Sequence, residues 1–340
     1  MSETRPENIY GWDLQQLESL VTGYGWPSYT ARQIALWLYK RHADDFSQMT
    51  NLSKKIRSEL ASSHIISVQD PVEMQLSADG TKKYLFPVEN KGYIESVFIP
   101  EDKRKTLCIS SQAGCRMGCR FCMTGRMGLK GNLSTGEILN QVRSIPERDL
   151  ITNLVFMGMG EPFDNLEAVL QSLEILTAEW GFSLSPRRIT VSTIGVVPAI
   201  GAFLNRSRCN LAISLHTPFE EERREMVPMS KAHPLADIMA AIRSYPIEKQ
   251  RRISFEYIVF KDVNHSQHHV KALARLLDKI RCHINLLSFH PIPGSSYRSP
   301  DQKTIEAFRD ALDNKGIMTT IRKSRGEDIQ AACGLLSCLK

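Results

Sequence analysis

The sequence lacks any long hydrophobic run. None of its apolar stretches approaches the roughly 20 residues that a membrane-spanning helix needs. The N-terminal residues 1–6 also lack the basic start and apolar core of a secretory signal peptide. With 42% hydrophobic and 24% charged residues, the composition is that of an ordinary globular protein. We therefore expect a cytoplasmic protein that makes no membrane contact.

A strong charge excess of either sign is absent as well. The formal net charge is +6, which permits a polyanionic partner such as nucleic acid without requiring one. Cysteine, by contrast, occurs eight times, and no cysteine lies within the first seventy residues. Disulfides are rare in a reducing cytoplasm, so metal binding or catalysis is the favoured interpretation of these cysteines.

The first hundred residues divide into two regions by pattern. Residues 1–72 show helical apolar spacing, with one helix predicted to end at Gly23 and another to begin after Ser53, and they form a predicted N-terminal helical domain. Residues 73–105 are predicted to form a strand-rich connector, with strands at 83–86 and 93–99 joined by a turn at 90–92. Basic side chains on the predicted helices, which serve either as RNA contacts or as a solvated face, are Lys40, Arg41, Lys54, Lys55 and Arg57.

Residues 106–340 alternate between strand and helix patterns and form a predicted catalytic domain. Apolar strands are expected at 106–110, 153–157, 188–193, 210–215, 253–260, 284–289 and 317–322. Amphipathic helical segments lie between them, and Ser134 and Glu137 form a capping box before one. This order predicts an α/β fold with a parallel sheet. Six strand–helix units are too few for an eight-fold barrel, so we predict a partial (β/α)6 barrel with its site at the carboxyl ends of the strands.

Three cysteines follow the first of these strands with the spacing C-x3-C-x2-C, namely Cys115, Cys119 and Cys122. Three thiolates on one short loop can bind three irons of a [4Fe–4S] cluster. Such clusters are normally held by four cysteines, so one iron would stay open to a substrate. The alternatives are a zinc site without its fourth ligand and a chance spacing.

This motif after the first strand of a six-fold β/α chain resembles the radical S-adenosylmethionine superfamily. Three longer stretches, residues 108–115, 157–162 and 325–334, resemble the narrower RlmN/Cfr family of RNA adenine methyltransferases. The resemblance extends from the N-terminal helices to Cys333. It implies a radical-SAM partial barrel, a [4Fe–4S] cluster and two molecules of S-adenosylmethionine for each turnover.

The resemblance also implies which residues contact the cofactor. The matching positions are Gly160, Glu161, Ser192, Ser214, Leu215, His216 and His290. His290 stands where the family often has asparagine. An imidazole can accept or donate one hydrogen bond, so the tautomer and the pH dependence of this contact are open questions.

Two further cysteines match the catalytic pair of the family. Cys333 matches the methyl-accepting cysteine, which suits a thiolate because it is a strong nucleophile. The implied order is methylation of Cys333, loss of one hydrogen from its S-methyl group, addition of the carbon to adenine and removal of a ring proton by Glu95. Cys108 then attacks the sulfur and leaves a Cys108–Cys333 disulfide. The thiols expected to be inert are Cys209, Cys282 and Cys338.

The resemblance implies RNA as the substrate. It implies C2 methylation of adenine 2503 in 23S ribosomal RNA and commonly of adenine 37 in some transfer RNAs, because residues 100–102 and 321–326 resemble the C2 group of the family. Base chemistry requires the adenine to leave its stack. Candidate phosphate contacts are Lys103, Arg104, Lys105, Arg187, Arg188, Arg251, Arg252, Arg322, Lys323 and Arg325. A low-potential electron donor such as flavodoxin is also implied, and we expect a monomer.

Three alternatives stay open at the level of sequence. The first is C8 methylation of the same adenine. The second is a radical enzyme that acts on another substrate, such as a protein, and therefore does not need Cys108 and Cys333 as a redox pair. The third is an RNA-binding protein with a structural or redox-sensing cluster, which would bind RNA but would not cleave S-adenosylmethionine.

Overall fold

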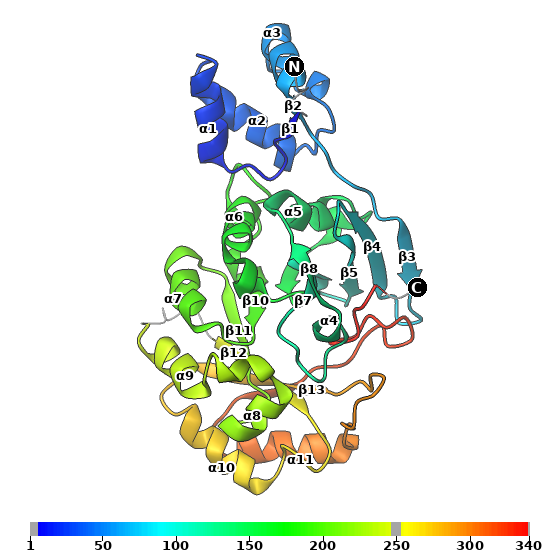
Figure 1. The fold of residues 1–340 in the computed structure, drawn as a ribbon, viewed down its shortest axis with the longest axis vertical. Helices are drawn as coiled ribbons and strands as arrows, with labels where there is room; N and C mark the ends of the chain where they lie inside the picture. Colours follow the sequence, from blue (N-terminus) through cyan, green and yellow to red (C-terminus); the bar gives the residue numbers. More distant parts are fainter. Residues whose placement is uncertain (1–5, 246–252, 339–340) are drawn as a thin grey trace.

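A ten-stranded sheet organises the molecule (Figure 1), and the computed structural model describes residues 6–245 and 253–338. The strand order is β14-β13-β12-β11-β10-β9-β6-β5-β4-β3. The strands from β6 to β14 pair in parallel. They are β6 (Lys105–Cys108), β9 (Asn153–Phe156), β10 (Ile189–Thr193), β11 (Asn210–Ser214), β12 (Ile253–Val259), β13 (Cys282–Ser288) and β14 (Thr319–Ile321).

Helices connect these parallel strands and cover the outer side of the sheet (Figure 1). They are α5 (Thr135–Arg143), α6 (Leu166–Thr177), α7 (Val197–Arg206), α8 (Glu220–Met226), α9 (Leu235–Arg243), α10 (Gln267–Leu276) and α11 (Gln302–Asp313). The short helix α4 (Met123–Arg126) lies instead at the inner side, where Thr124 and Gly125 line the barrel interior. The predicted capping box at the start of α5 is present. The strands lie within a few residues of their predicted positions, so the prediction of a partial (β/α)6 barrel is confirmed.

The predicted connector extends the same sheet with antiparallel strands. These are β3 (Glu73–Leu76), β4 (Lys82–Val88) and β5 (Gly92–Pro100), and Asn90, with φ of +59°, forms the turn between the last two. A separate hairpin of β7 (Gln112–Cys115) and β8 (Gly128–Asn132) was not predicted. The division of the chain at residues 72 and 105 stays a prediction.

The N-terminal region contains β1 (Glu7–Asn8), α1 (Leu14–Gly23), α2 (Tyr29–Tyr39), α3 (Lys54–Ser63) and β2 (His64–Ile65). It packs on α5 by close backbone contact, since a Cβ atom added at Gly136 would lie 2.4 Å from the carbonyl oxygen of Tyr10. The buried Arg143 donates hydrogen bonds to the carbonyl oxygens of His42 and Ala43 at 2.8 and 2.9 Å. These contacts fix the N-terminal helices against the barrel.

Short 3-10 helices complete the secondary structure, namely η1 (Phe46–Gln48), η2 (Arg148–Leu150), η3 (Pro162–Asn165), η4 (Pro186–Arg188) and η5 (Pro228–Lys231). Among the described residues, no helix is both long and apolar enough to cross a bilayer.

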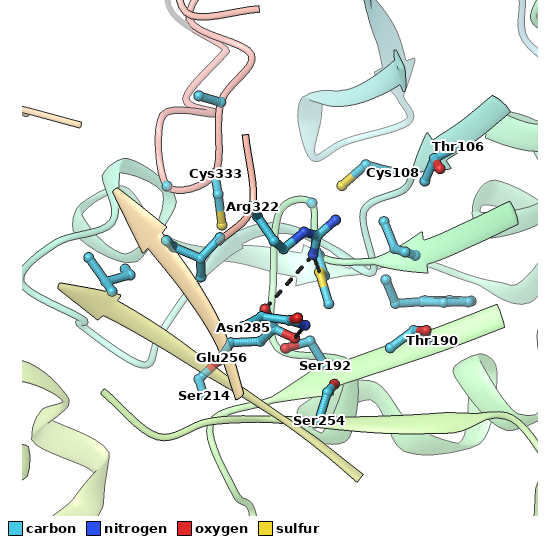
Figure 2. Close-up of a pocket in the computed structure, with 18 of the residues that line it drawn as sticks. Thr106, Cys108, Thr190, Ser192, Ser214, Ser254, Glu256, Asn285, Arg322 and Cys333 are labelled. Atoms are coloured by element: carbon cyan, nitrogen blue, oxygen red, sulfur yellow. Dashed lines mark hydrogen bonds and ion pairs between the residues drawn. The ribbon is translucent and has the colours of Figure 1, made fainter. Parts of the chain in front are cut away.

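The barrel strands have one polar and one apolar face. On β12, Phe255 and Tyr257 are fully buried, and Tyr257 packs against Phe308 of α11 with ring centroids 5.5 Å apart. The alternate residues Ser254 and Glu256 point to the inside of the barrel (Figure 2), because side chains alternate across a strand. The interior is therefore lined by polar groups that can meet a ligand, while the outer face forms the core with the helices.

A C-terminal coil follows β14 and returns along the antiparallel edge of the sheet (Figure 1). Asp328 accepts hydrogen bonds from the Ser77 hydroxyl at 2.6 Å and the Ala78 N–H at 3.0 Å. Asp79 accepts one from the Gly326 N–H at 3.0 Å. The coil is thus held against the turn between β3 and β4, and this position brings Cys333 over the barrel interior.

Candidate active site

A cavity of about 970 Å³ fills the inside of the partial barrel. Inward-facing strand residues form its walls, and the C-terminal coil closes one side (Figure 2). All of the predicted site residues line this cavity except Glu95 and Leu215. Those that do are Cys108, Cys115, Cys119, Cys122, Gly160, Glu161, Ser192, Ser214, His216, His290 and Cys333.

The three cysteines of the C-x3-C-x2-C motif share one wall of the cavity. Cys115 ends β7, and Cys119 and Cys122 lie in the turn that leads into α4, where the Cys122 N–H donates to the Cys119 carbonyl oxygen at 3.2 Å. Burial raises the pKa of Cys115 to about 12, and burial together with the charges of its two neighbours raises the pKa of Cys119 well above 9. Burial therefore favours the neutral thiols, and a cation bound among them would favour the thiolates.

The three thiols suit the ligands of an iron–sulfur cluster, because a cubane binds each cysteine through a different iron. The motif thus offers three cluster ligands beside open cavity space, which suits a cluster with one open iron.

Gly160 and Glu161 form the loop after β9. Gly160 has φ of +97°, and a Cβ atom there would lie 2.5 Å from the Cβ of Gln112, so only glycine fits. The Glu161 carboxylate is buried and accepts hydrogen bonds from the N–H groups of Phe163 and Ile194, both at 3.0 Å. Burial raises its pKa to about 7. The side chain of Glu161 therefore ties two loops together. The carbonyl oxygens of Met159 and Glu161 already accept backbone hydrogen bonds, so the Gly160 carbonyl is the group of this loop that can meet a ligand.

Ser192 lies near the end of β10, Ser214 ends β11 and His216 follows it, and the side chains of all three reach the cavity. His216 has φ of +62°, and its Nδ1 accepts a hydrogen bond from the Ile258 N–H at 3.1 Å. That bond leaves the proton on the buried Nε2, which has no partner among the described residues. Burial lowers the pKa of His216 to about 3. A neutral imidazole with one unused N–H donor thus faces the cavity and fits a cofactor contact.

Leu215 lies outside the cavity lining, whereas His290 is part of it. Leu215 is fully buried away from the cavity, and its N–H donates to the carbonyl oxygen of Glu256 at 2.9 Å, so it shapes the loop after β11. His290 lines the cavity, with Nε2 at 2.8 Å from the Ser324 hydroxyl and Nδ1 at 3.9 Å from Glu327. Burial lowers the pKa of His290, and the Glu327 carboxylate opposes this effect. His290 therefore joins the loop after β13 to the C-terminal coil.

Cys108 and Cys333 both point into the cavity (Figure 2). Cys108 ends β6, and burial, followed by the charge of Cys333, raises its pKa to about 12. Cys333 is exposed as a residue and lines the cavity, and the protein atoms around its thiol raise its pKa to about 11. All eight cysteines are free thiols in this structure. The Cys108–Cys333 disulfide therefore stays a prediction for one stage of turnover.

The coil that carries Cys333 is anchored to α4. The Gly334 carbonyl oxygen accepts a hydrogen bond from the Met123 N–H at 2.8 Å, and the Leu336 carbonyl oxygen accepts one from the Thr124 hydroxyl at 2.6 Å. Since Met123 directly follows Cys122, the cysteine loop and the Cys333 coil are fixed to each other.

Glu95 lies outside the cavity lining. Its buried carboxylate forms an ion pair with Lys83 at 3.1 Å and accepts hydrogen bonds from the N–H groups of Ser337 and Cys338 at 2.8 and 3.2 Å. Its predicted role in proton removal stays a prediction and requires residues 337–338 to move. Cys338 also lies away from the cavity, with Sγ at 3.1 Å from the Tyr93 carbonyl oxygen.

Sequence reasoning missed two polar residues of the cavity wall, Glu256 and Asn285. They are paired in register on β12 and β13, and the Asn285 amide donates to the Glu256 carboxylate at 2.8 Å. Each lies within a strand that reads as apolar and buried. A lone acid in such a run, 256 within 253–260, is the signal that could have found it, because a buried carboxylate needs a partner.

Several of the predicted phosphate contacts gather at this cavity. Those lining it are Arg104, Arg187, Arg188, Arg322, Lys323 and Arg325. Lys105 instead donates to the Glu101 carbonyl oxygen at 2.6 Å. Arg251 and Arg252 lie outside the described residues. The cavity therefore combines a three-cysteine loop, a facing pair of thiols and several basic side chains.

Known proteins are similar to this chain over nearly its whole length. Residues 7–66 match a family described as the ribosomal RNA large subunit methyltransferase N-terminal domain, and residues 109–277 match the radical SAM superfamily. A "probable dual-specificity RNA methyltransferase RlmN" of Bacteroides thetaiotaomicron is 50% identical, over 98% of this chain and 96% of that protein. The "dual-specificity RNA methyltransferase RlmN" of Geotalea uraniireducens is 43% identical, over 97% of this chain and 96% of that protein.

A solved structure agrees with the fold. The crystal structure of a radical SAM methyltransferase from Sphaerobacter thermophilus superposes with a TM-score of 0.89 at 41% identity, covering 97% of this chain and 99% of that one. The radical SAM relationship implies the [4Fe–4S] cluster and S-adenosylmethionine that the cysteine loop and the cavity fit. The chain belongs to the RlmN family of radical S-adenosylmethionine enzymes.

Proposed function

We propose that this protein methylates C2 of adenine in RNA, at adenine 2503 of 23S ribosomal RNA and at adenine 37 of some transfer RNAs. The printed names of its relatives, which describe dual-specificity RNA methyltransferases, support this function. The observation that carries the proposal is the pair of thiols, Cys108 and Cys333, which face one cavity beside the cysteine loop. A radical enzyme without a methyl-carrying cysteine needs no such pair.

The three cysteines of the loop would hold a [4Fe–4S] cluster, which with bound S-adenosylmethionine supplies a 5′-deoxyadenosyl radical and a methyl group. The residues of this chain then bind and orient the cofactor. Gly160 offers its backbone carbonyl, and the Nε2–H of His216 offers one donor. Ser192 and Ser214 supply hydroxyl groups from neighbouring strands. All of these lie at the carboxyl ends of strands, where ligands of parallel sheets bind.

The two thiols would serve different steps of the methyl transfer. The C2 carbon of adenine is electron-poor, so it does not act as a nucleophile toward the methyl group of S-adenosylmethionine. Cys333 accepts the methyl group as a thiolate, and the 5′-deoxyadenosyl radical then takes one hydrogen from its S-methyl group. The resulting carbon radical bonds to C2, and the one electron left unpaired on the adduct would pass to the cluster that the cysteine loop would hold. Glu95 takes the ring proton once residues 337–338 have moved from its carboxylate. Cys108 then attacks the Cys333 sulfur and releases the methylated RNA.

Basic side chains would hold the RNA while the adenine enters. Arg187 and Arg188 lie on one side of the cavity and Lys323 and Arg325 on the C-terminal coil, so they can contact phosphates around a flipped nucleotide. A monomer that acts in the cytoplasm, with a flavodoxin-like electron donor, completes the proposal.

The test uses anaerobically reconstituted protein with reductant, S-adenosylmethionine and unmodified 23S ribosomal RNA or transfer RNA. The RNA is then digested, and the nucleosides are separated and identified by mass spectrometry. We expect 2-methyladenosine from the wild type and from Cys282→Ala, and none from Cys333→Ala. Formation of 8-methyladenosine, or cofactor cleavage without any RNA product, contradicts the proposal.

A further inference from the structure

Arg322 begins the C-terminal coil and extends into the cavity. Its N–H donates to the Leu286 carbonyl oxygen at 2.9 Å, which fixes the start of the coil against β13. The guanidinium shares the cavity with Cys108 and Cys333 (Figure 2), and its charge acts on both thiols. Nη1 lies 3.7 Å from the sulfur of Met157, whose backbone is hydrogen-bonded to Cys108. A cation therefore faces the same cavity as the two thiols of the proposed reaction.

The Glu256 carboxylate forms an ion pair with the Arg322 guanidinium. Its Oε1 accepts a hydrogen bond from the side-chain amide of Asn285 at 2.8 Å. The side-chain oxygen Oδ1 of Asn285 accepts one in turn from the Thr320 hydroxyl at 2.6 Å, so these contacts orient the carboxylate. Its Oε2 is buried without a hydrogen bond among the described residues and lies 3.8 Å from Nη1 of Arg322. Because the Glu256 carboxylate is buried, its ion pair keeps the guanidinium in the cavity.

A nearby cation favours ionisation of the Cys108 thiol. The thiol is buried at the end of β6, and burial opposes its ionisation. The titratable and charged groups that act on it are Cys333, which opposes the thiolate, and Arg322, which favours it. Only the thiolate attacks sulfur, so the release step depends on the charge of Arg322.

We propose that Arg322, held by Glu256, is a positioning residue that stabilises the Cys108 thiolate for its attack on the Cys333 sulfur. This inference rests on the proposed function. In the step it serves, the Cys108 thiolate forms an S–S bond with Cys333, and the bond between the Cys333 sulfur and the methylene carbon breaks. The electron pair of that bond stays on the carbon, which takes a proton from solvent and becomes the methyl group. The two sulfurs are oxidised, and the carbon is reduced.

The first test measures the rate at which iodoacetamide alkylates Cys108 in the anaerobic holoprotein at pH 8, by mass spectrometry of the peptide that contains it. We expect Arg322→Gln to slow alkylation about three- to tenfold, as for a thiol pKa raised by about one unit with partly compensating nucleophilicity. Arg322→Lys keeps the charge and should stay within about twofold of wild type. Arg309→Gln removes one exposed arginine elsewhere and should leave the rate unchanged.

The sign of this effect separates electrostatics from packing. A merely structural role for Arg322 predicts that its loss loosens the cavity and speeds alkylation in both variants. An unchanged or faster rate in Arg322→Gln, or an equal slowing in Arg322→Lys, overturns the proposal.

The second test follows turnover with RNA. Slow attack by Cys108 should make the covalent protein–RNA adduct accumulate in Arg322→Gln, several-fold above wild type and less in Arg322→Lys. A loss of RNA affinity with no accumulated adduct would instead make Arg322 a phosphate contact and would overturn the inference. If wild-type protein gives neither adduct nor methylated adenine, the proposed function fails, whereas the alkylation result still decides the role of Arg322 at Cys108.

Discussion

Glu95 on β5 accepts a hydrogen bond from the backbone N–H of Ser337 at 2.8 Å, although the two residues stand 242 positions apart. The contact anchors the segment that follows Cys333 to the antiparallel part of the sheet. The same segment is anchored to α4 at its other end through Gly334 and Leu336. The proposed proton acceptor and the coil of the methyl-carrying cysteine are therefore mechanically linked, and release of the coil is what would free Glu95.

The first prediction concerns the ion pair of Glu95 with Lys83, whose side chains are 3% and 7% exposed. Replacing one partner leaves the other charge buried without compensation. We expect Glu95→Gln to lower the free energy of unfolding by about 3–5 kcal/mol, and the double variant with Lys83→Met to recover a large part of it. Chemical denaturation of the full chain measures both.

The exposed pair of Arg206 with Glu167 provides the matched control for that experiment. Its side chains are 51% and 75% exposed, so Glu167→Gln should cost no more than about 1 kcal/mol. Equal costs for Glu95→Gln and Glu167→Gln would contradict the buried ion pair.

A second prediction concerns Gly160 in the loop after β9. Alanine there would clash with Gln112 and would adopt a left-handed backbone, which costs about 1–2 kcal/mol before the clash is counted. We expect Gly160→Ala to destabilise the protein and to abolish S-adenosylmethionine binding, measured by calorimetry. In contrast, Gly201 lies in α7 with open space around it, so Gly201→Ala should be neutral or stabilising by up to about 1 kcal/mol. Retained cofactor binding in Gly160→Ala would count against this loop as a contact.

A third prediction follows from the buried, neutral His216. Its pKa is lowered to about 3 in the folded protein, against an ordinary value of 6.5. Below pH 6.5 the unfolded chain therefore takes up a proton that the folded protein does not, and stability falls toward pH 3; above pH 6.5 the group has no effect. Between pH 7.5 and 5.5 this histidine alone should cost about 1.4 kcal/mol.

His42 acts in the same direction, because burial lowers its pKa to about 4. The informative comparison is therefore between wild type and His216→Gln, measured by denaturant unfolding at several pH values. The variant should lose less stability than wild type as the pH falls. Parallel curves would mean that His216 is not held neutral in the fold.

A fourth prediction concerns removal of the metal cluster. Cys119→Ala takes away one of the three thiol ligands on the loop, so we expect loss of bound iron and of cofactor cleavage. Cys282→Ala changes a thiol that begins β13, outside the cavity lining, and should retain the iron content of wild type. Iron and sulfide assays measure the cluster, and circular dichroism checks the fold of both variants. Full iron occupancy in Cys119→Ala would contradict the assignment of the loop.

The parts of the fold that were predictable depend on local sequence patterns. The barrel strands are short apolar runs, and the helices between them carry amphipathic spacing and, for α5, a capping box. The cluster motif is equally local, since its three cysteines lie within eight residues. The β7–β8 hairpin escaped prediction because it is glycine-rich and lacks the alternating apolar pattern of a strand.

The missed features depend on contacts between distant parts of the chain. Nothing near Glu95 in the sequence indicates that residues 337–338 cover it. Arg322 stands in a basic run that reads as a phosphate contact, and only the return of the coil over the barrel turns its guanidinium toward Glu256. The family resemblance supplied the roles of Cys108 and Cys333, whereas the structure adds that both face one cavity together with the guanidinium of Arg322.

The central claim is that the transferred carbon passes through Cys333, and isotope labelling tests it most directly. S-adenosylmethionine with a CD3 methyl group is supplied to the anaerobic holoprotein with unmodified RNA in ordinary water. Because one deuterium is lost while the carbon is bound to Cys333 and one solvent hydrogen is gained on release, the product should be 2-methyladenosine with a CHD2 group. A product that carries an intact CD3 group would mean direct methyl transfer and would contradict the account.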